Sequence, residues 1–372
     1  MERIQKSLIS KDLTKKMVFI VGPRQVGKTW LAQEIAKDYS NSLYLNYDHR
    51  EDRDIIHSES WLPTTDLLIL DEIHKMKDWK NFLKGVYDTS PEKLQILVTG
   101  SARLDVFRQS GDSLAGRYFL HHLLPFSYKE SSIGKKFPID HLMERGGFPE
   151  PVLAETPEDA IRWRNQYAES LIRYDILDFE NIHDLRAIQL LFHLLRSRVG
   201  SPVSCKSISE DIGKSPNTIK KYIQILEALF IVFRITPYAR NISRSLRKEP
   251  KLYFYDTGLV QGDEGVRFEN FIAVSLLKHL SFVHDTKGTI TQLHYLRTKE
   301  RQEVDFCLVI NGQAKLMVEA KHSDSTASRH LHYFNKRFDI LGVQVVRHLK
   351  KEHVSGNITV RKAENFLLEL KA

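Results

Sequence analysis

The sequence predicts an α/β protein of several domains, in which a parallel sheet wrapped by helices comes first and a second α/β domain comes last. Three observations lead to this prediction. Short apolar runs alternate with helical patterns through the first 125 residues. Helical patterns replace the strands after Pro125, and strand-like runs dominate again after Asp256. At about 100 to 200 residues per domain, a chain of 372 residues holds two or three cores.

The composition excludes several classes of protein. Hydrophobic residues make up 42% and charged residues 27%, which is typical of a globular chain rather than a disordered or fibrous one. No apolar run approaches the roughly 20 residues that span a membrane, and the first residues lack the apolar core of a signal peptide, so we expect a cytoplasmic protein without a membrane partner. Cys205 and Cys307 lie far apart without Cys or His spacing around them, so neither a disulfide framework nor a zinc site is predicted.

The strongest motif is GPRQVGKT, which fits the spacing G-x-x-x-x-G-K-[ST]. It follows the apolar run Met17–Val21 and precedes a helical pattern from Thr29 to Lys37. Its glycines let backbone N–H groups surround phosphate oxygens, Lys28 neutralises the β and γ oxygens, and Thr29 ligates Mg²⁺. The candidate nucleotide-binding residues of the loop are Gly22, Pro23, Arg24, Gln25, Val26, Gly27, Lys28 and Thr29. The motif predicts that ATP and Mg²⁺ bind here.

A strand that ends in two carboxylates completes the predicted site. Four apolar residues, from Leu67 to Leu70, precede Asp71 and Glu72, which therefore emerge at the C-terminal end of a buried strand. We expect Asp71 to hold Mg²⁺ through water and Glu72 to polarise the attacking water. Adjacent acids that merely begin a loop are the alternative, which the upstream phosphate loop disfavours.

Residues at the end of the next strand add further candidates. Thr99 or Ser101 is predicted to sense the γ-phosphate, and Ser101 is counted with the nucleotide-binding residues. Arg103 and Arg117 are candidates for stabilising charge in the transition state. A solvated surface arginine is an equal alternative for both.

The ordered motifs resemble one protein family over nearly the whole chain. GPRQVGKT, LDEIHKMKDW, VTGSAR, SLAGR, LLPFSYKE and GGFPEP occur in the order found in prokaryotic ATPases of the AAA superfamily that end in the domain of unknown function DUF4143. The segments RFENFIAVSLLKHL, HYLRTKERQEVDF and MVEAKHS extend the likeness to the C-terminal region. The resemblance implies a nucleotide-binding core, a lid, a winged helix and a nuclease-like end, and it implies no particular substrate. Trp30 departs from the family, in which a small or aliphatic residue usually follows the loop threonine, and we expect its ring to pack near the nucleotide.

The patterns divide the chain into four segments. We expect a P-loop ATPase core of the AAA type over residues 1–125, a helical lid over 126–200, a winged helix-turn-helix over 201–256 and a C-terminal α/β domain like the restriction endonucleases over 257–372. The sequence leaves open whether the chain forms a homo-oligomer that depends on nucleotide.

The third segment is strongly basic. From Gly200 to Asp256 it carries ten basic and five acidic residues, which gives it +5 of the net charge of +8. Two short helical patterns with a turn at Gly213 and a cap at Ser215 outline a helix-turn-helix followed by a hairpin. The residues expected on the outside of its helices are Lys214, Lys220 and Lys221. The residues expected to follow phosphates from the hairpin are Arg234, Arg240, Arg244, Arg247, Lys248 and Lys251. We expect nucleic acid, in particular DNA, to bind there through its phosphates; a solvated surface on a module that only regulates the nucleotide site is the alternative.

Three carboxylates and a lysine mark the C-terminal domain. Glu269 lies on its first predicted helix, and Asp305 lies within the strand EVDF. Glu319 and Lys321 alternate on the next strand, so they share one sheet face, and a hairpin brings Asp305 beside them. Asp305 and Glu319 are the predicted Mg²⁺ ligands. All four residues are predicted to be catalytic in phosphodiester cleavage.

This arrangement resembles the PD-(D/E)xK nuclease core, in which a helix, three strands, a helix and a strand follow one another. Val304 stands where that motif has proline. Tyr295 and Arg297, on the preceding strand, are expected to support a phosphate. A salt-bridged strand surface is the alternative explanation for Glu319 and Lys321.

Two hypotheses about function remain open. In the first, an ATP-hydrolysing enzyme couples its nucleotide state to DNA binding and, in its strongest form, to Mg²⁺-dependent DNA cleavage. In the second, the chain is an ATP-dependent switch or scaffold whose nuclease-like domain only binds nucleic acid or a protein partner. Cleavage that is lost on changing Asp305 to Ala separates the two.

Overall fold

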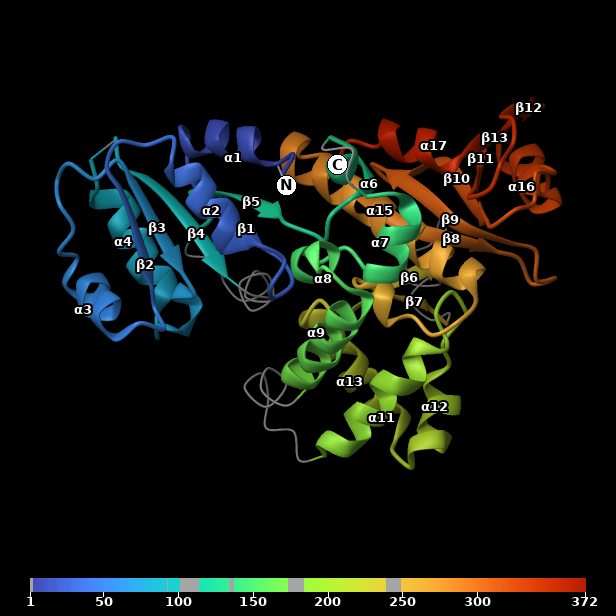
Figure 1. Ribbon diagram of the computed structural model, residues 1–372, viewed down its shortest axis with the longest axis horizontal. Coiled ribbons are helices and arrows are strands. Elements are labelled where there is room, and N and C mark those ends of the chain that lie inside the picture. Colours follow the sequence, from blue (N-terminus) through green and yellow to red (C-terminus); the bar gives the residue numbers. More distant parts are fainter. Residues whose placement is uncertain (1–2, 92, 101–113, 134–136, 173–183, 239–248) are drawn as a thin grey trace. The chain divides into compact units, whose positions relative to one another are not determined.

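The computed structural model describes residues 3–91, 93–100, 114–133, 137–172, 184–238 and 249–372 (Figure 1). The chain forms two compact units, Met1–Leu124 and Pro125–Ala372. The first contains a parallel sheet and the second a larger mixed sheet with helices. The prediction of a mixed α/β protein with a second α/β domain at its C-terminal end is therefore confirmed. Within the described ranges, no helix is long and apolar enough to cross a membrane.

The first unit is built on a parallel sheet with the strand order β2-β3-β4-β1-β5. The strands are β1 (Met17–Val21), β2 (Ser42–Asn46), β3 (Leu67–Asp71), β4 (Gln95–Gly100) and β5 (Tyr118–His122). The first four are the predicted apolar runs, and β5 was missed. Because all strands run the same way, the C-terminal ends of β1, β3 and β4 lie at one edge of the sheet, where the phosphate loop begins.

Helices cover both faces of this sheet. They are α1 (Lys6–Leu13), α2 (Lys28–Ala36), α3 (Arg50–Ser58) and α4 (Trp79–Thr89), with a short 3-10 turn, η1 (Ile73–Lys75). Phe19 of β1 belongs to a core cluster with Ile56 of α3 and Leu83 of α4. Its neighbours Val18 and Ile20 are fully buried as well, and strand alternation points them to the opposite face. A strand apolar on both faces is what a doubly covered parallel sheet requires.

The second unit opens with seven helices among the residues described. They are α6 (Tyr128–Ile133), α7 (Ile139–Arg145), α8 (Pro149–Leu153), α9 (Pro157–Ser170), α11 (Leu185–Arg196), α12 (Cys205–Ile212) and α13 (Pro216–Ala228). The predicted turn between the last two is present: Gly213 ends α12 with a φ of 71°, and the Ser215 hydroxyl accepts a hydrogen bond from the Thr218 amide at the start of α13.

A mixed sheet of eight strands, in the order β12-β13-β11-β10-β9-β8-β6-β7, forms the rest of the second unit. Its strands are β6 (Val232–Pro237), β7 (Lys251–Phe254), β8 (Thr291–Arg297), β9 (Glu303–Ile310), β10 (Gln313–Lys321), β11 (Leu341–Val346), β12 (His353–Ser355) and β13 (Ile358–Lys362). Its helices are α15 (Glu264–Lys287), α16 (Arg329–Phe338) and α17 (Ala363–Glu369) (Figure 1). The elements α15, β8, β9, β10, α16 and β11 follow the predicted order of helix, three strands, helix and strand.

The β6–β7 hairpin joins the C-terminal sheet. β6 pairs antiparallel with β7 on one side and parallel with β8 on the other. A side chain on β7 is therefore carried by the same sheet as the predicted acidic residues on β9 and β10. The subdivision of this unit at residues 200 and 256 stays a prediction.

Candidate functional sites

The phosphate loop has the backbone that its sequence requires. Gly22 has a φ of 152°, and a Cβ there would lie 2.1 Å from the carbonyl oxygen of Leu123, so only glycine fits. Gly27 has a φ of 95° and is the N-cap residue directly before α2. The loop therefore delivers Lys28 and Thr29 to the first turn of α2, at the helix end that favours anions.

Lys28 is folded back into the loop. Its Nζ donates hydrogen bonds to the carbonyl oxygens of Gly22 (3.0 Å) and Pro23 (2.7 Å). Burial lowers the pKa of Lys28 to about 8, although Glu72 and Asp71 favour its charged form. The ammonium is thus held by two carbonyl oxygens of the loop itself.

Three hydroxyl groups converge on the carboxylate of Asp71, at the end of β3. Thr29, at the end of the phosphate loop, donates to Oδ2 at 2.8 Å. Tyr44, from the neighbouring strand β2, donates to the same oxygen at 2.7 Å. Thr99 of β4 donates to Oδ1 at 2.6 Å, so its buried hydroxyl holds Asp71, a different contact from the phosphate sensing expected of it.

Glu72 follows Asp71 in the left-handed region of the backbone, with a φ of 55°. One of its carboxylate oxygens lies 3.4 Å from Nε2 of His74 and 3.9 Å from Nζ of Lys75. Burial, and then the charge of Asp71, raise the pKa of Glu72 above its ordinary value. A carboxylate that accepts a proton more readily than usual suits a general base.

The other residues predicted to lie near the nucleotide take no part in this group of contacts around Asp71 in the structure described. Arg117 forms a two-bond pair with Asp88, with distances of 2.8 and 2.9 Å, so its guanidinium is engaged within the first unit. Trp30 is partly exposed on α2, and its contact with nucleotide stays a prediction. Ser101 and Arg103 lie outside the described residues.

A second group of predicted residues comes together in the C-terminal sheet. Phe306 of β9 is paired with Val318 of β10, so Asp305 and Glu319 lie opposite each other on one face. Asp305 Oδ2 accepts a hydrogen bond from the Ala320 amide (2.9 Å). Lys321 Nζ lies 3.0 Å from Oε1 of Glu319. We call Glu269, Glu303, Asp305, Glu319 and their cationic partners the acidic centre.

The remaining oxygen of Glu319 has no hydrogen-bond partner in the part of the chain that the structure describes. Oε2 is buried and accepts no hydrogen bond from any described residue, and the residue as a whole is 3% exposed. Burial, and then the charge of Asp305, raise the pKa of both Glu269 and Glu319 to about 7. Buried oxygens without a donor are rare in folded proteins. A cation or a hydrogen-bond donor could therefore bind to this oxygen of the acidic centre.

Glu269 enters from α15 but is held by the protein. Its Oε1 accepts a hydrogen bond from the Tyr253 hydroxyl (2.7 Å) and lies 3.6 Å from Nζ of Lys251. Among the residues that the structure describes, no group of three or more His, Cys, Asp or Glu side chains is placed to hold a metal ion. Convergence of Glu269, Asp305 and Glu319 on one ion is thus not seen, and Asp305 and Glu319 remain the candidate ligand pair.

The position of Lys251 differs from the one predicted from the charge pattern of the sequence. It was expected to follow nucleic-acid phosphates from the hairpin, yet it is 1% exposed and its ammonium lies among the carboxylates of the acidic centre. β7 carries it inward because β7 is paired into the sheet and buried along its whole length. Sequence reasoning also missed Glu303, Tyr253 and Tyr44, whose roles depend on which strands become neighbours.

Most of the other basic residues predicted to contact nucleic acid either form ion pairs within the protein or lie outside the described residues. Lys214 is 2.6 Å from Asp184, and Arg234 is 3.2 Å from Glu227. Lys220 is exposed on α13, as is Lys221. Arg240, Arg244, Arg247 and Lys248 lie outside the described residues.

The two residues expected to support a phosphate are engaged beside the acidic centre. The Tyr295 hydroxyl donates to the Glu249 carbonyl oxygen (2.7 Å), and Arg297 pairs with Glu303 (3.1 Å). Both contacts are internal to the second unit. Support of a substrate phosphate by either residue stays a prediction.

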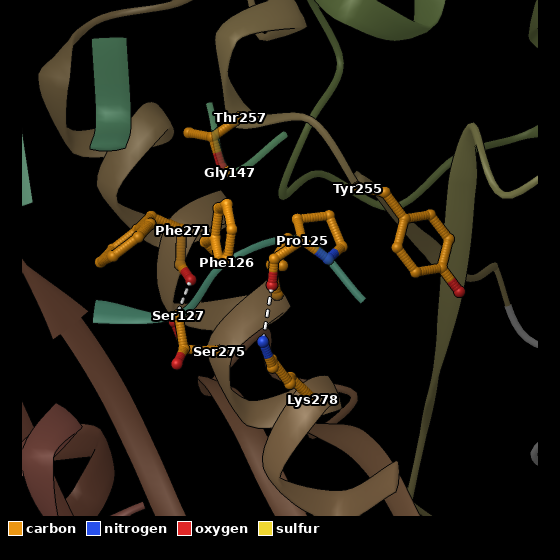
Figure 2. Close-up of a pocket in the computed structure, with 10 residues that line it drawn as sticks. Pro125, Phe126, Ser127, Gly147, Tyr255, Thr257, Phe271, Ser275 and Lys278 are labelled. Atoms are coloured by element: carbon orange, nitrogen blue, oxygen red, sulfur yellow. Dashed lines mark hydrogen bonds between the residues drawn. The ribbon is translucent and has the colours of Figure 1, made fainter. Parts of the chain in front are cut away.

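A small cavity lies beside α15. Figure 2 shows Lys278 directed at the carbonyl oxygen of Pro125, to which it donates a 2.8 Å hydrogen bond; Lys278 also pairs with buried Glu130. Phe126 and Phe271 are among the residues that line the space. Its volume of about 10 Å³ accommodates one water molecule at most.

Comparison with known proteins gives the class of this chain. Residues 14–132 match the family described as an AAA domain, and residues 264–365 match the domain of unknown function DUF4143. Residues 137–266, between them, match the domain of unknown function DUF8612. The chain therefore carries an AAA domain and a C-terminal DUF4143 domain, consistent with a prokaryotic P-loop ATPase of the AAA type, and the family resemblance is confirmed. The AAA match supports binding and hydrolysis of ATP by the first unit.

Individual relatives are distant. An uncharacterized protein of Mycobacterium tuberculosis is 25% identical over 308 residues, covering 80% of this chain and 68% of its own length. One from Methanocaldococcus jannaschii is 22% identical over 404 aligned positions, covering 98% of this chain and 86% of its own. Among solved structures, a Walker-type ATPase of Pyrococcus abyssi superposes with a TM-score of 0.45 and 14% identity, covering 68% of this chain and 93% of that one.

Proposed function

We propose that the protein is a Mg²⁺-dependent ATPase that binds the triphosphate with the loop from Gly22 to Thr29 and uses Glu72 as the general base. The observation that carries this proposal is the meeting of Thr29 with Asp71, next to Lys28 and Glu72, at one edge of the parallel sheet. These are the hydroxyl, carboxylate, ammonium and base that phosphoryl transfer to water needs.

The residues present fit a magnesium ion. Mg²⁺ prefers oxygen ligands and keeps several waters, and the Thr29 hydroxyl and the Asp71 carboxylate supply such oxygens side by side. The ion would neutralise charge on the phosphate oxygens. Tyr44 and Thr99 fix the orientation of Asp71 by their hydrogen bonds to its carboxylate.

The proposed reaction follows from the same side chains. Water attacks the γ-phosphorus, the bond to the oxygen that bridges to ADP breaks, and Glu72 takes the proton of the water. Lys28 exchanges the carbonyl oxygens of Gly22 and Pro23 for phosphate oxygens, which keeps its ammonium paired. The raised pKa of Glu72 favours its acceptance of the proton.

Two variants test this function. Lys28→Ala should remove ATP binding, because the triphosphate then lacks its main positive partner. Glu72→Gln should bind ATP but release phosphate about a hundred- to ten-thousand-fold more slowly, as loss of a general base predicts. Binding is measured with a fluorescent ATP analogue and turnover by phosphate release. Normal turnover in the Glu72 variant would remove this residue from the role of base.

A second function, phosphodiester hydrolysis at the acidic centre, is favoured by the Asp305–Glu319 pair. The two carboxylates face each other across β9 and β10, Lys321 lies beside them, and Glu319 keeps one buried oxygen without a donor. Two carboxylates and a lysine suffice to hold one divalent ion and steady an attacking water. Lys220 and Lys221, exposed on α13, suit contact with the phosphates of DNA.

Nuclease activity is tested with plasmid, branched and single-stranded DNA in the presence of Mg²⁺ or Mn²⁺. Cutting by the full chain that is abolished by Asp305→Ala, while ATP turnover persists, supports the proposal. DNA binding without cutting by any chain supports the alternative of an ATP-dependent switch or scaffold. Mass measurement with and without ATP then tests whether a homo-oligomer forms with nucleotide.

A further inference from the structure

Lys251 is the most deeply buried charge of the acidic centre. It is the first residue of β7, and its Nζ lies 2.7 Å from Oε1 of Glu303, 3.6 Å from Oε1 of Glu269 and 3.9 Å from Oδ1 of Asp305. The ring of Tyr295 lies 5.4 Å away and closes another side. Only 1% of the residue is exposed, so bulk water does not screen these interactions.

The surroundings keep this ammonium charged. Burial by itself would lower the pKa of Lys251, but the carboxylates of Glu269, Asp305 and Glu303 together raise it above its ordinary value. A buried charge persists only when it is paired, and removal of its partner is costly. Lys251 is thus a permanent cation of the centre rather than a surface contact for phosphate.

The charges of the centre are unevenly distributed. Lys251 faces Glu303, Glu269 and Asp305, and Arg297 binds the second oxygen of Glu303 (3.1 Å). On the other side, Glu319 has Lys321 on one oxygen only. The Glu269 side is therefore compensated by Lys251 and Arg297, whereas on the other side Glu319 keeps one buried oxygen without a partner among the described residues.

We infer that Lys251 is the resident cation of the acidic centre, which occupies the side formed by Glu269 and Glu303 and leaves room for a single divalent ion between Asp305 and Glu319. Nucleases with two metal ions hold them about 4 Å apart, each bound by carboxylates. Here an ammonium carried by β7 takes the place of one of them. The inference rests on the proposed metal site and adds the number of ions and the side chain that sets it.

The inference is tested by counting the Mn²⁺ ions that the parent chain and its variants bind. Mn²⁺ is titrated calorimetrically into the full chain without nucleotide, in an Asp71→Asn background that removes any ion held at the phosphate loop. The chain with Lys251 should bind one Mn²⁺, and Asp305→Asn should abolish that binding. Lys251→Met keeps the length of the side chain but not its charge, and the chain that carries it should bind two Mn²⁺ ions. Lys315→Met, at an exposed position of β10, is the matched control and should still bind one.

Thermal unfolding of the same chains, with and without Mn²⁺, checks whether the Lys251 variant folds. Three carboxylates without their ammonium repel one another, so Lys251→Met should melt at a lower temperature than the parent and regain more stability from Mn²⁺ than the parent does. If it fails to fold, Lys251→Gln, which keeps a hydrogen-bond donor for the carboxylates but not the charge, is the second variant and should fold. Lys251→Gln should then bind two Mn²⁺ ions and gain more stability from them than the parent does, as Lys251→Met would.

The possible failures differ. If Lys251→Met or Lys251→Gln binds one Mn²⁺ with the parent's affinity and is stabilised by it no more than the parent, Lys251 excludes no ion and the inference is wrong. If the parent binds two ions, the inference is also wrong, while the metal site stands. If no chain binds Mn²⁺ in a way that Asp305→Asn removes, the proposed metal site itself fails.

Discussion

The phenol of Tyr44 donates a hydrogen bond of 2.7 Å to Oδ2 of Asp71 on the neighbouring strand. The same oxygen accepts the hydroxyl of Thr29, and Thr99 holds the other oxygen. The carboxylate expected to position Mg²⁺ is therefore oriented from three sides before any nucleotide arrives. Such preorganisation means that binding need not supply the free energy to order this side chain.

Tyr44→Phe tests this restraint. Losing one hydrogen bond to a charged group costs about 1.5 kcal/mol or more, so the Mg²⁺ concentration that half-saturates ATP hydrolysis should rise about tenfold. The maximal rate at saturating Mg²⁺ should change little. Tyr39→Phe is the control, since the Tyr39 hydroxyl donates to Gln95 and not to the site. An unaltered Mg²⁺ requirement in the Tyr44 variant would leave Asp71 oriented without its help.

ATP binding should take up protons near pH 8. Burial lowers the pKa of Lys28 to about 8 in the chain without nucleotide, and triphosphate oxygens favour its charged form. At that pH about half of the lysines are neutral, so each binding event should take up about half a proton. Calorimetry in two buffers of different ionisation enthalpy measures this uptake. Lys28→Arg, which stays charged, should show none, and equal heats for the parent in both buffers would contradict the prediction.

Local patterns explain what the sequence predicted well. The phosphate loop and the Asp71–Glu72 pair are contiguous motifs whose structure depends on neighbours in the chain, and both have the expected backbone setting. Strand β5 was missed because its run, Tyr118–His122, contains two histidines and is only partly buried. Tyr44 gave no signal because its contact with Asp71 depends on the pairing of β2 with β3.

Long-range pairing explains what was predicted wrongly. A count of charges along the chain places Lys251 with the other basic residues of the hairpin. The sheet instead pairs β7 with β6 and β6 with β8, and Lys251 becomes a core residue facing α15 and β9. Asp305 and Glu319 were predicted as neighbours because a hairpin of consecutive strands fixes their register.

The stability of the second unit should fall as pH rises from about 4.5 to about 7. Burial raises the pKa of Glu269 and Glu319 to about 7, above the ordinary carboxyl value, so the folded state binds more protons than the unfolded state in this window. Their stabilising protonation is complete below about pH 4.5 and is lost as the pH approaches 7. For one group the loss is at most about 3 kcal/mol.

Urea unfolding in EDTA at about pH 5 and about pH 7.5 measures this loss. Glu319→Gln is neutral at both values, so its free energy of unfolding should decline less than that of the parent. Glu300→Gln, at a carboxyl that lies outside the acidic centre, should decline as the parent does. The same slope in all three chains would show that Glu319 does not titrate in this window.

A buried ion pair outside both sites should dominate the stability of the helical part of the second unit. Nε of Arg164 on α9 lies 3.3 Å from Oδ2 of Asp256, and its NH2 group donates to the carbonyl oxygens of Glu144 (3.1 Å) and Arg145 (2.9 Å). Asp256 also accepts the Gly258 amide at 3.0 Å. Both charged side chains are almost fully buried, so neither can turn to water when its partner is removed.

Asp256→Ala should therefore lower the free energy of unfolding by about 3 to 5 kcal/mol, because it leaves the Arg164 guanidinium buried beside an apolar gap. Arg164→Met should lower the free energy of unfolding by a similar amount, because it leaves the carboxylate of Asp256 buried without its cationic partner. The double variant should cost clearly less than the sum of the two, since it removes both charges together. Urea unfolding followed by circular dichroism measures all three. Strict additivity would mean that the two side chains act independently, and the contact between α9 and the segment at Asp256 would then be maintained by apolar packing alone.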